Sequence, residues 1–167
     1  MSQVAAMLQE LDQEAHTTRR LLERVPDERL EWKPHPKART LGQLALHVAA
    51  VPGLVASFAC QPSPVQMPTL ASDPSPASAA ELLTALSESI GTAKAKVGAL
   101  DDAALAAPWR LMAGDRELVA APLGGFLRSV MLNHWYHHRG QLSAYLRELD
   151  VPIPSIYGPS ADENPFG

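Results

Sequence analysis

The sequence lacks the residues for an internal disulfide bond. Cys60 is the only cysteine among the 167 residues, so no two thiols of one chain can be joined. A chain of this length buries enough apolar surface to fold without covalent cross-links. Because structural disulfides are typical of oxidising compartments, their exclusion agrees with a cytoplasmic protein, which is the location we expect.

Concentrated positive charge is also missing. The chain has 14 Lys and Arg residues against 18 Asp and Glu residues, which gives a formal net charge of -4, and the basic residues are spread along the sequence. Proteins that bind nucleic acid hold its phosphates with clustered Lys and Arg side chains. We therefore expect no nucleic acid among the partners.

We expect no secretory signal in this sequence, which has one long uncharged run. The first 20 residues, MSQVAAMLQELDQEAHTTRR, mix acidic and basic side chains and contain no apolar block. Residues 41–60 approach the length of a membrane helix, but they include Gln43, His47 and Pro52 and are apolar largely through alanine. We expect this run to be a core helix and expect no membrane partner.

Four segments show the apolar periodicity of an α-helix. They cover about residues 3–25, 40–60, 79–99 and 125–148. Thr40, at the start of the second segment, is a residue type that caps helix N-termini. Amphipathic segments of this length bury their apolar faces against one another. The sequence therefore predicts an all-α fold, a four-helix bundle formed by a single domain that spans residues 1–167.

The connections between the predicted helices differ in kind. Residues 61–76, QPSPVQMPTLASDPSP, hold five prolines, which predicts a long extended crossover between helices 2 and 3 and allows these helices to run parallel. Residues 108–125 contain two short mixed stretches around the sequence AGD, which predict a small hairpin before helix 4. The proline-rich tail, residues 150–167, is expected to lie extended over the bundle.

Three of the six histidines interrupt the apolar faces of predicted helices. His134 and His138 are four positions apart, so they lie about 40° apart on one face of an α-helix. His47 occupies the apolar stripe of the second helix. Three imidazoles from two helices can form a metal site with open positions for water or substrate. They can equally be core histidines that hydrogen-bond to their neighbours, and spacing alone leaves both interpretations open.

The other three histidines are weaker candidates. His137 lies beside the apolar stripe of helix 4. It could support the metal ligands from behind, contact a second subunit or face solvent, and we expect that it is not a ligand itself. His16 lies one residue off the stripe of the first helix and is expected to be exposed. His35 lies between two prolines, in a loop with restricted backbone, and a structural role is expected there.

Two helix-breaking residues lie close to the candidate histidines. Pro52 has no N–H to donate to the Val48 carbonyl, so the sequence predicts a kink one turn after His47. Gly140 lies two residues after His138, and glycine costs about 1 kcal/mol relative to alanine in an exposed helix. We expect Gly140 to allow a close contact with another helix.

Three stretches of sequence carry a family resemblance. They are WKPHPKARTLGQLALHVAAVPG, LRSVMLNHWYHHRGQLSAYLRELDVPIPSIYGPSADE and, more loosely, PWRLMAGDRELVAAPL, in which one histidine is followed much later by H-x-x-x-H-R-G-Q. The chain resembles the DinB-like superfamily of damage-inducible, metal-binding four-helix bundles. The resemblance implies a long crossover between helices 2 and 3, a homodimer, and metal ligands at His47, His134 and His138, which periodicity also selects.

At such a site the metal ion itself would supply the reactivity. Zinc proteases with the motif H-E-x-x-H place a glutamate general base directly after the first histidine, where this chain has Trp135. Three neutral imidazoles leave the charge of a divalent ion uncompensated, which favours an anionic fourth ligand such as hydroxide or thiolate. Zinc or nickel is the ion expected with imidazole ligands.

Three functions are open at this point. The resemblance favours an S-transferase-like enzyme that activates a low-molecular-weight thiol, its small-molecule substrate, against an electrophile. One alternative is a metal-dependent hydrolase that uses metal-bound hydroxide. The other is a dimeric metal-binding module without catalysis. A closed site would suit that module, and Asp162 or Glu163 of the tail is a candidate for the closing ligand.

Overall fold

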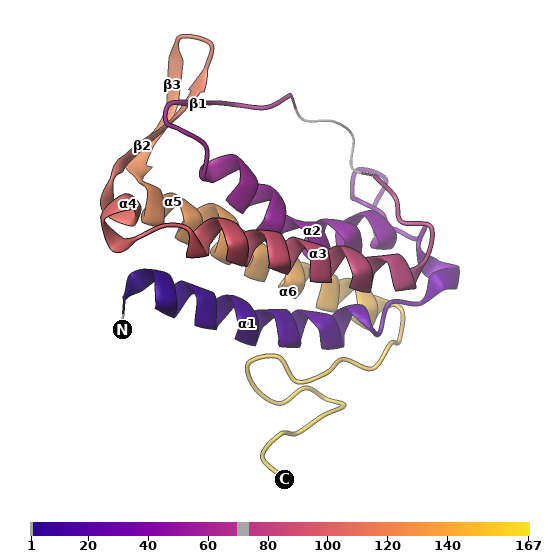
Figure 1. Ribbon diagram of the computed structural model, residues 1–167. Coiled ribbons are helices and arrows are strands. Elements are labelled where there is room, and N and C mark those ends of the chain that lie inside the picture. Colours follow the sequence, from indigo (N-terminus) through magenta and orange to yellow (C-terminus); the bar gives the residue numbers. More distant parts are fainter. Residues whose placement is uncertain (1, 70–73) are drawn as a thin grey trace.

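The computed structural model describes residues 2–69 and 74–167, and four long helical segments form its main body (Figure 1). They are α1 (Gln3–Leu22), α2 (Leu41–Ala59), α3 (Ala79–Gly98), and a composite segment of α5 (Leu123–Phe126), η2 (Leu127–Asn133) and α6 (His134–Glu148). A 3-10 turn, η1 (Asp27–Arg29), lies between α1 and α2, and a short helix, α4 (Asp102–Ala106), follows α3. The helices expected at about 3–25, 40–60 and 79–99 are confirmed within three residues at each end.

Side-chain caps fix the first residues of two long helices. Thr40 accepts a hydrogen bond from the Gln43 backbone N–H, and the Gln43 side chain accepts one from the Thr40 N–H. This reciprocal capping confirms Thr40 as the start of α2. Helix α1 begins in a similar way, with Ser2 accepting from Ala5 and the Asp102 carboxylate of α4 accepting from the first two helical N–H groups. The backbone N–H groups of the first turn have no acceptor within the helix, and these contacts satisfy them.

The last helical segment departs from the single α-helix that periodicity predicts at 125–148. Residues Leu127–Asn133 form a π-helical stretch, and regular α-helix resumes only at His134. Leu127 and Met131 still face the core, with no exposed surface. A π-helix has a wider turn than an α-helix and occurs often beside functional sites. Here it immediately precedes the two histidines of α6.

The fold is not all-α, which corrects the sequence-based prediction. Strands β2 (Pro108–Ala113) and β3 (Arg116–Pro122) form the predicted antiparallel hairpin, whose turn contains Gly114 at a φ of 58°. A third strand, β1 (Val65–Gln66), comes from the proline-rich crossover and pairs in parallel with β2, with Val65 opposite Leu111. Two residues between prolines carry no periodic signal, and their pairing partner lies more than 40 positions away. Sequence reasoning therefore missed β1.

The crossover allows α2 and α3 to run in the same direction (Figure 1). Gly42 of α2 lies against Pro76, just before α3, and Gly53 lies against Ser89, so contacts advance together along both segments. A side chain at Gly53 would place its Cβ 2.8 Å from Ser89 backbone atoms, so this glycine permits the close approach. The expectation of a close helix contact at Gly140 is wrong, because a Cβ at this position would meet nothing within 4 Å. Residues 70–73 of the predicted crossover lie outside the described residues.

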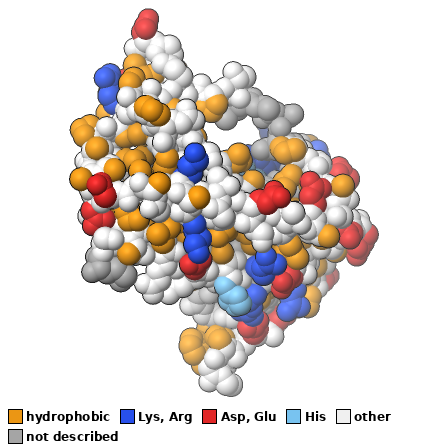
Figure 2. All heavy atoms as spheres, in the orientation of Figure 1, with side chains coloured by type: hydrophobic (Ala, Val, Ile, Leu, Met, Phe, Trp, Pro, Cys, Tyr) orange, Lys and Arg blue, Asp and Glu red, His pale blue; other side chains and the backbone are white. Residues whose placement is uncertain are grey.

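Helix α2 lies in the core of the bundle. Its mean hydropathy of 1.5 and its length would suffice for a membrane span, but 56% of that window is buried inside the protein, and buried core helices meet the same criteria. It packs against α3, η2 and α6. The expectation of a core helix at residues 41–60 is confirmed. On the face seen in Figure 2, acidic and basic side chains are intermingled and are not separated by sign.

The C-terminal tail folds back on itself and does not run fully extended, because Asp162 accepts from the Ile153 N–H and Ser160 donates to the Ile153 carbonyl. Polar contacts fasten it to α1 and α6. Arg20 of α1 pairs with Glu163 at 2.5 Å, and Arg147 of α6 pairs with Asp162. The tail therefore lies against α1 and α6, and Figure 1 shows it below α1.

Candidate metal centre

His47 of α2 and His134 and His138 of α6 come together between the two helices. One ring nitrogen from each lies within 4.8 Å of the other two. The ring centroids are 5.3 Å apart for His47 and His134, 4.6 Å for His47 and His138, and 4.5 Å for His134 and His138. All three side chains are half-buried. The structure thus brings together the three residues that the stripes of two separate helices select.

The cluster fits a divalent ion. Three atoms within 4.8 Å of one another have a common point no more than about 2.8 Å from each, and zinc–imidazole bonds measure about 2.0–2.1 Å. Side-chain rotation over a fraction of an ångström closes this difference. Neutral imidazole is a common ligand of zinc, nickel and copper. Within the described residues the cluster contains these three histidines and no carboxylate or thiol.

Gln141 orients one of the three rings. Its side-chain oxygen lies 2.9 Å from His138 Nδ1, and an amide oxygen can only accept, so Nδ1 carries the proton. The lone pair of His138 is then on Nε2, the nitrogen left for a metal. Metal-binding histidines usually have such a partner on their second nitrogen. Sequence reasoning missed Gln141, although its position three residues after His138 on one helix was a usable signal.

Burial holds two of the imidazoles in the neutral form. Desolvation lowers the pKa of His134 below its ordinary value of 6.5, the backbone of Val130 opposes this shift, and the electrostatic effects of the nearby His137 and Arg39 act in the same direction as desolvation. Desolvation lowers the pKa of His138 as well, against the opposing effect of the hydrogen bond that its ring donates to Gln141. His134 Nδ1 is buried and makes no hydrogen bond within the described part of the chain. Such groups are costly unless a partner satisfies them.

The other histidines lie outside the cluster. His137, His16 and His35 are exposed, which confirms the expectation for His16. The His137 ring packs beside that of His138, with 4.9 Å between centroids, on the solvent side. His35 Nδ1 accepts a hydrogen bond from the Lys37 N–H at 3.2 Å, which agrees with a structural role in its loop.

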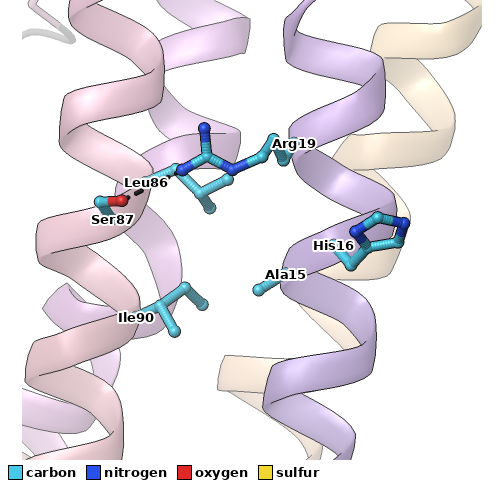
Figure 3. Close-up of a pocket in the computed structure, with 6 residues that line it drawn as sticks. All are labelled: Ala15, His16, Arg19, Leu86, Ser87 and Ile90. Carbon is cyan, nitrogen blue, oxygen red and sulfur yellow. Dashed lines mark hydrogen bonds between the residues drawn. The ribbon is translucent and has the colours of Figure 1, made fainter.

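A hollow of about 320 Å³ lies between α1 and α3 (Figure 3). Arg19 reaches across it from α1 and donates to Ser87 of α3 at 3.1 Å, while His16 projects from α1 away from Ser87. The three histidines of the cluster are not among the residues that line this hollow. The hollow therefore does not form part of the candidate metal centre.

The tail carboxylates are held elsewhere. Asp162 pairs with Arg147 and accepts from the Ile153 N–H, and these contacts lower its pKa. Glu163 pairs with Arg20 at 2.5 Å, which lowers its pKa in the same way. Both side chains are thus engaged by arginines and lie outside the histidine cluster. In the described chain, neither carboxylate closes the site.

The arginine of the H-R-G-Q motif is buried and ion-paired. The Arg139 side chain is 1% exposed and contacts the Glu14 carboxylate of α1 at 2.5 Å. It also donates to Thr18 Oγ1 at 3.2 Å and to the Tyr157 hydroxyl of the tail, and it lies 5.2 Å from the centre of the Tyr136 ring. Arg139 therefore fastens α6 to α1 and to the tail directly after His138. Sequence reasoning missed this role, because the partners come from α1 and the tail.

Comparison with known proteins shows which family and which solved structures this chain resembles. The model of the DinB family matches residues 1–164. The uncharacterized protein YrdA of Bacillus subtilis (strain 168) is 28% identical over 154 residues, which cover 90% of this chain and 85% of that protein. A DinB-like protein from Bacillus cereus superposes with a TM-score of 0.69 at 26% identity, over 94% of this chain and 100% of that one. The DinB-like protein YjoA of Bacillus subtilis shares the fold, with a TM-score of 0.62 at 17% identity over 87% of this chain and 92% of that one.

Proposed function

This chain belongs to the DinB family, and from that membership we propose that it binds one divalent ion, zinc or nickel, through His47, His134 and His138 and activates a small thiol there. The observation that carries the proposal is the convergence of three imidazole nitrogens from two helices within 4.8 Å of one another. Imidazole suits zinc and nickel among the divalent ions, and availability decides between metals of similar affinity.

A divalent ion held by these three histidines would supply a nucleophile at neutral pH, because a bound metal lowers the pKa of a coordinated thiol or water. The protein supplies the geometry and the protonation state of the ligands. Gln141 holds His138 with Nε2 directed away from the hydrogen-bonded side of the ring, and the lowered pKa of His134 and His138 keeps both rings neutral. Both tail carboxylates are held in ion pairs and do not join the three histidines, which supports a site that would be open to a small molecule.

Metal titration of the purified apo-protein tests the first part of this proposal. Zn²⁺ or Ni²⁺ is added in competition with a chromophoric chelator, and one ion per chain is expected. Replacing any one of His47, His134 and His138 with alanine should abolish most of the uptake. His16→Ala and His137→Ala are the matched controls and should bind nearly as well as the unaltered protein, because their rings lie outside the cluster. Full occupancy in His134→Ala or His138→Ala would show that the ligand assignment is wrong.

A reaction screen tests the second part. The metal-loaded protein is mixed with several low-molecular-weight thiols and an electrophilic probe, and loss of the free thiol is followed with time. Transfer that disappears in His47→Ala supports the thiol transferase. Ester hydrolysis without any thiol would replace it with a metal-dependent hydrolase. The absence of both activities would favour a binding module without catalysis.

We further propose that the protein works as a homodimer in the cytoplasm, without nucleic acid or membrane partners. The family resemblance supports the dimer. Light scattering at micromolar concentration should detect twice the 18.0 kDa chain mass, and a single species at the chain mass would overturn the dimer.

A further inference from the structure

The indole ring of Trp135 joins α6 to α2 beside the histidine cluster. Its Nε1–H donates to the Val48 carbonyl at 2.8 Å, and its side chain has no exposed surface. Trp135 directly follows His134 in the sequence, and Val48 directly follows His47. The hydrogen bond therefore connects the two helices one residue away from a proposed ligand on each of them.

The Val48 carbonyl is available for this bond because of Pro52. In a regular α-helix the carbonyl of residue 48 accepts from the N–H of residue 52, and proline has no N–H. The sequence predicts the loss of that bond, and the structure supplies the Trp135 indole in its place. A buried carbonyl without a donor is costly. The proline thus turns an internal helix bond of α2 into a bond between α2 and α6.

The following turn of α2 is held from the other side by α3. Ser89 donates to the Ala50 carbonyl at 3.0 Å and accepts from the Gly53 N–H at 2.8 Å. Gly53 makes this possible, since a side chain there would collide with Ser89. The part of α2 that follows His47 is therefore bonded to α6 on one side and to α3 on the other, which restricts its sliding along α6.

We propose that Trp135 is the positioning residue of the three-histidine site: its bond to Val48 sets the spacing between His47 and the two histidines of α6 and so preorganises them for the metal. This inference rests on the proposed metal binding. Ligands that are held close to their productive geometry bind without paying to be ordered, and loss of an orienting partner typically lowers metal affinity about 10- to 100-fold. Trp135→Phe keeps an aromatic ring in the core and removes the donor, so Zn²⁺ affinity should fall at least about tenfold.

Trp109 provides a matched control. Its buried indole N–H donates to the Ala59 carbonyl of the same helix at 2.9 Å. Ala59 lies twelve residues beyond His47, about 18 Å along a helix. Trp109→Phe therefore removes the same kind of bond from α2, at a distance from the cluster. We expect it to lower the thermal unfolding temperature about as much as Trp135→Phe does, while Zn²⁺ affinity stays at the wild-type value.

A second substitution separates positioning from simple satisfaction of the carbonyl. In the double variant Trp135→Phe with Pro52→Ala, the new N–H of residue 52 can donate to Val48 within α2, but no bond to α6 is restored. We expect the unfolding temperature to recover and the Zn²⁺ affinity to remain at least about tenfold below wild type. Recovery of both would show that Trp135 only satisfies a buried carbonyl, which overturns the inference.

The closing experiment measures Zn²⁺ affinity by chelator competition and unfolding of the same metal-free samples by circular dichroism, for the wild-type chain and the three variants. Absence of Zn²⁺ uptake by the wild-type chain would refute the proposed function itself. Wild-type uptake together with equal affinity in Trp135→Phe refutes only the positioning role. If Trp135→Phe does not fold, the double variant takes its place, and wild-type affinity in that variant has the same meaning.

Discussion

Neutralising Glu14 should destabilise the protein through the buried guanidinium of Arg139. The Arg139 side chain is 1% exposed and that of Glu14 is 14% exposed, with 2.5 Å between them. Removing one partner of a buried pair costs about 3–5 kcal/mol, because the other charge stays buried without compensation. In Glu14→Gln, Arg139 keeps its contacts with the Glu14 backbone carbonyl, Thr18 and Tyr157. We therefore expect a loss at the lower end of this range, about 3 kcal/mol.

Urea unfolding followed by circular dichroism measures this loss as a lower midpoint at an unchanged slope. The matched control is Asp12→Asn, which breaks the Lys94–Asp12 pair. The side chains of that pair are 40% and 57% exposed, and such pairs contribute about 0–1 kcal/mol. A loss in Glu14→Gln no larger than that in Asp12→Asn would refute the reasoning. Adding Arg139→Met to Glu14→Gln should restore stability, because the uncompensated charge is then removed.

Further predictions concern protons, tautomers and glycines. The unfolded chain protonates His134 and His138 near their ordinary pKa of 6.5, whereas the folded chain does so only at lower pH. These groups should therefore leave the stability of the apo-protein unchanged above pH 6.5 and lower it as the pH falls below 6.5. Equal urea midpoints at about pH 5 and pH 8 would contradict this prediction. Gln141→Leu should lower Zn²⁺ affinity about 10- to 100-fold in chelator competition, and an unchanged affinity would show that the His138 tautomer needs no partner. Gly53→Ala should cost about 1–3 kcal/mol in urea unfolding because its Cβ meets Ser89 backbone atoms at 2.8 Å. Gly140→Ala should stabilise the folded protein by about 0.5–1 kcal/mol, because nothing lies within 4 Å of the new Cβ. Stability changes of the same sign at both glycines would contradict the close packing described at Gly53.

The features that sequence alone predicted depend on residues close together along the chain. The 3–4 spacing of apolar side chains located the helices, and Thr40 marked the start of α2 through a contact only three residues long. The same local rule placed His134 and His138 on one face of a helix. Pro52 revealed a carbonyl without its usual donor, because that relation also spans four residues.

Tertiary structure decided everything that joins distant segments. The pairing of β1 with β2, the burial of Arg139 against Glu14 and the diversion of both tail carboxylates to arginines each connect residues more than 14 positions apart, and no local period encodes them. The sequence also could not tell that Gly53, and not Gly140, lies at a close helix contact. Helical spacing selected His47 and the histidine pair separately. Only the packing of α2 against α6 brings their nitrogens within 4.8 Å of one another, because the distance between two helices depends on the side chains that fill the space between them.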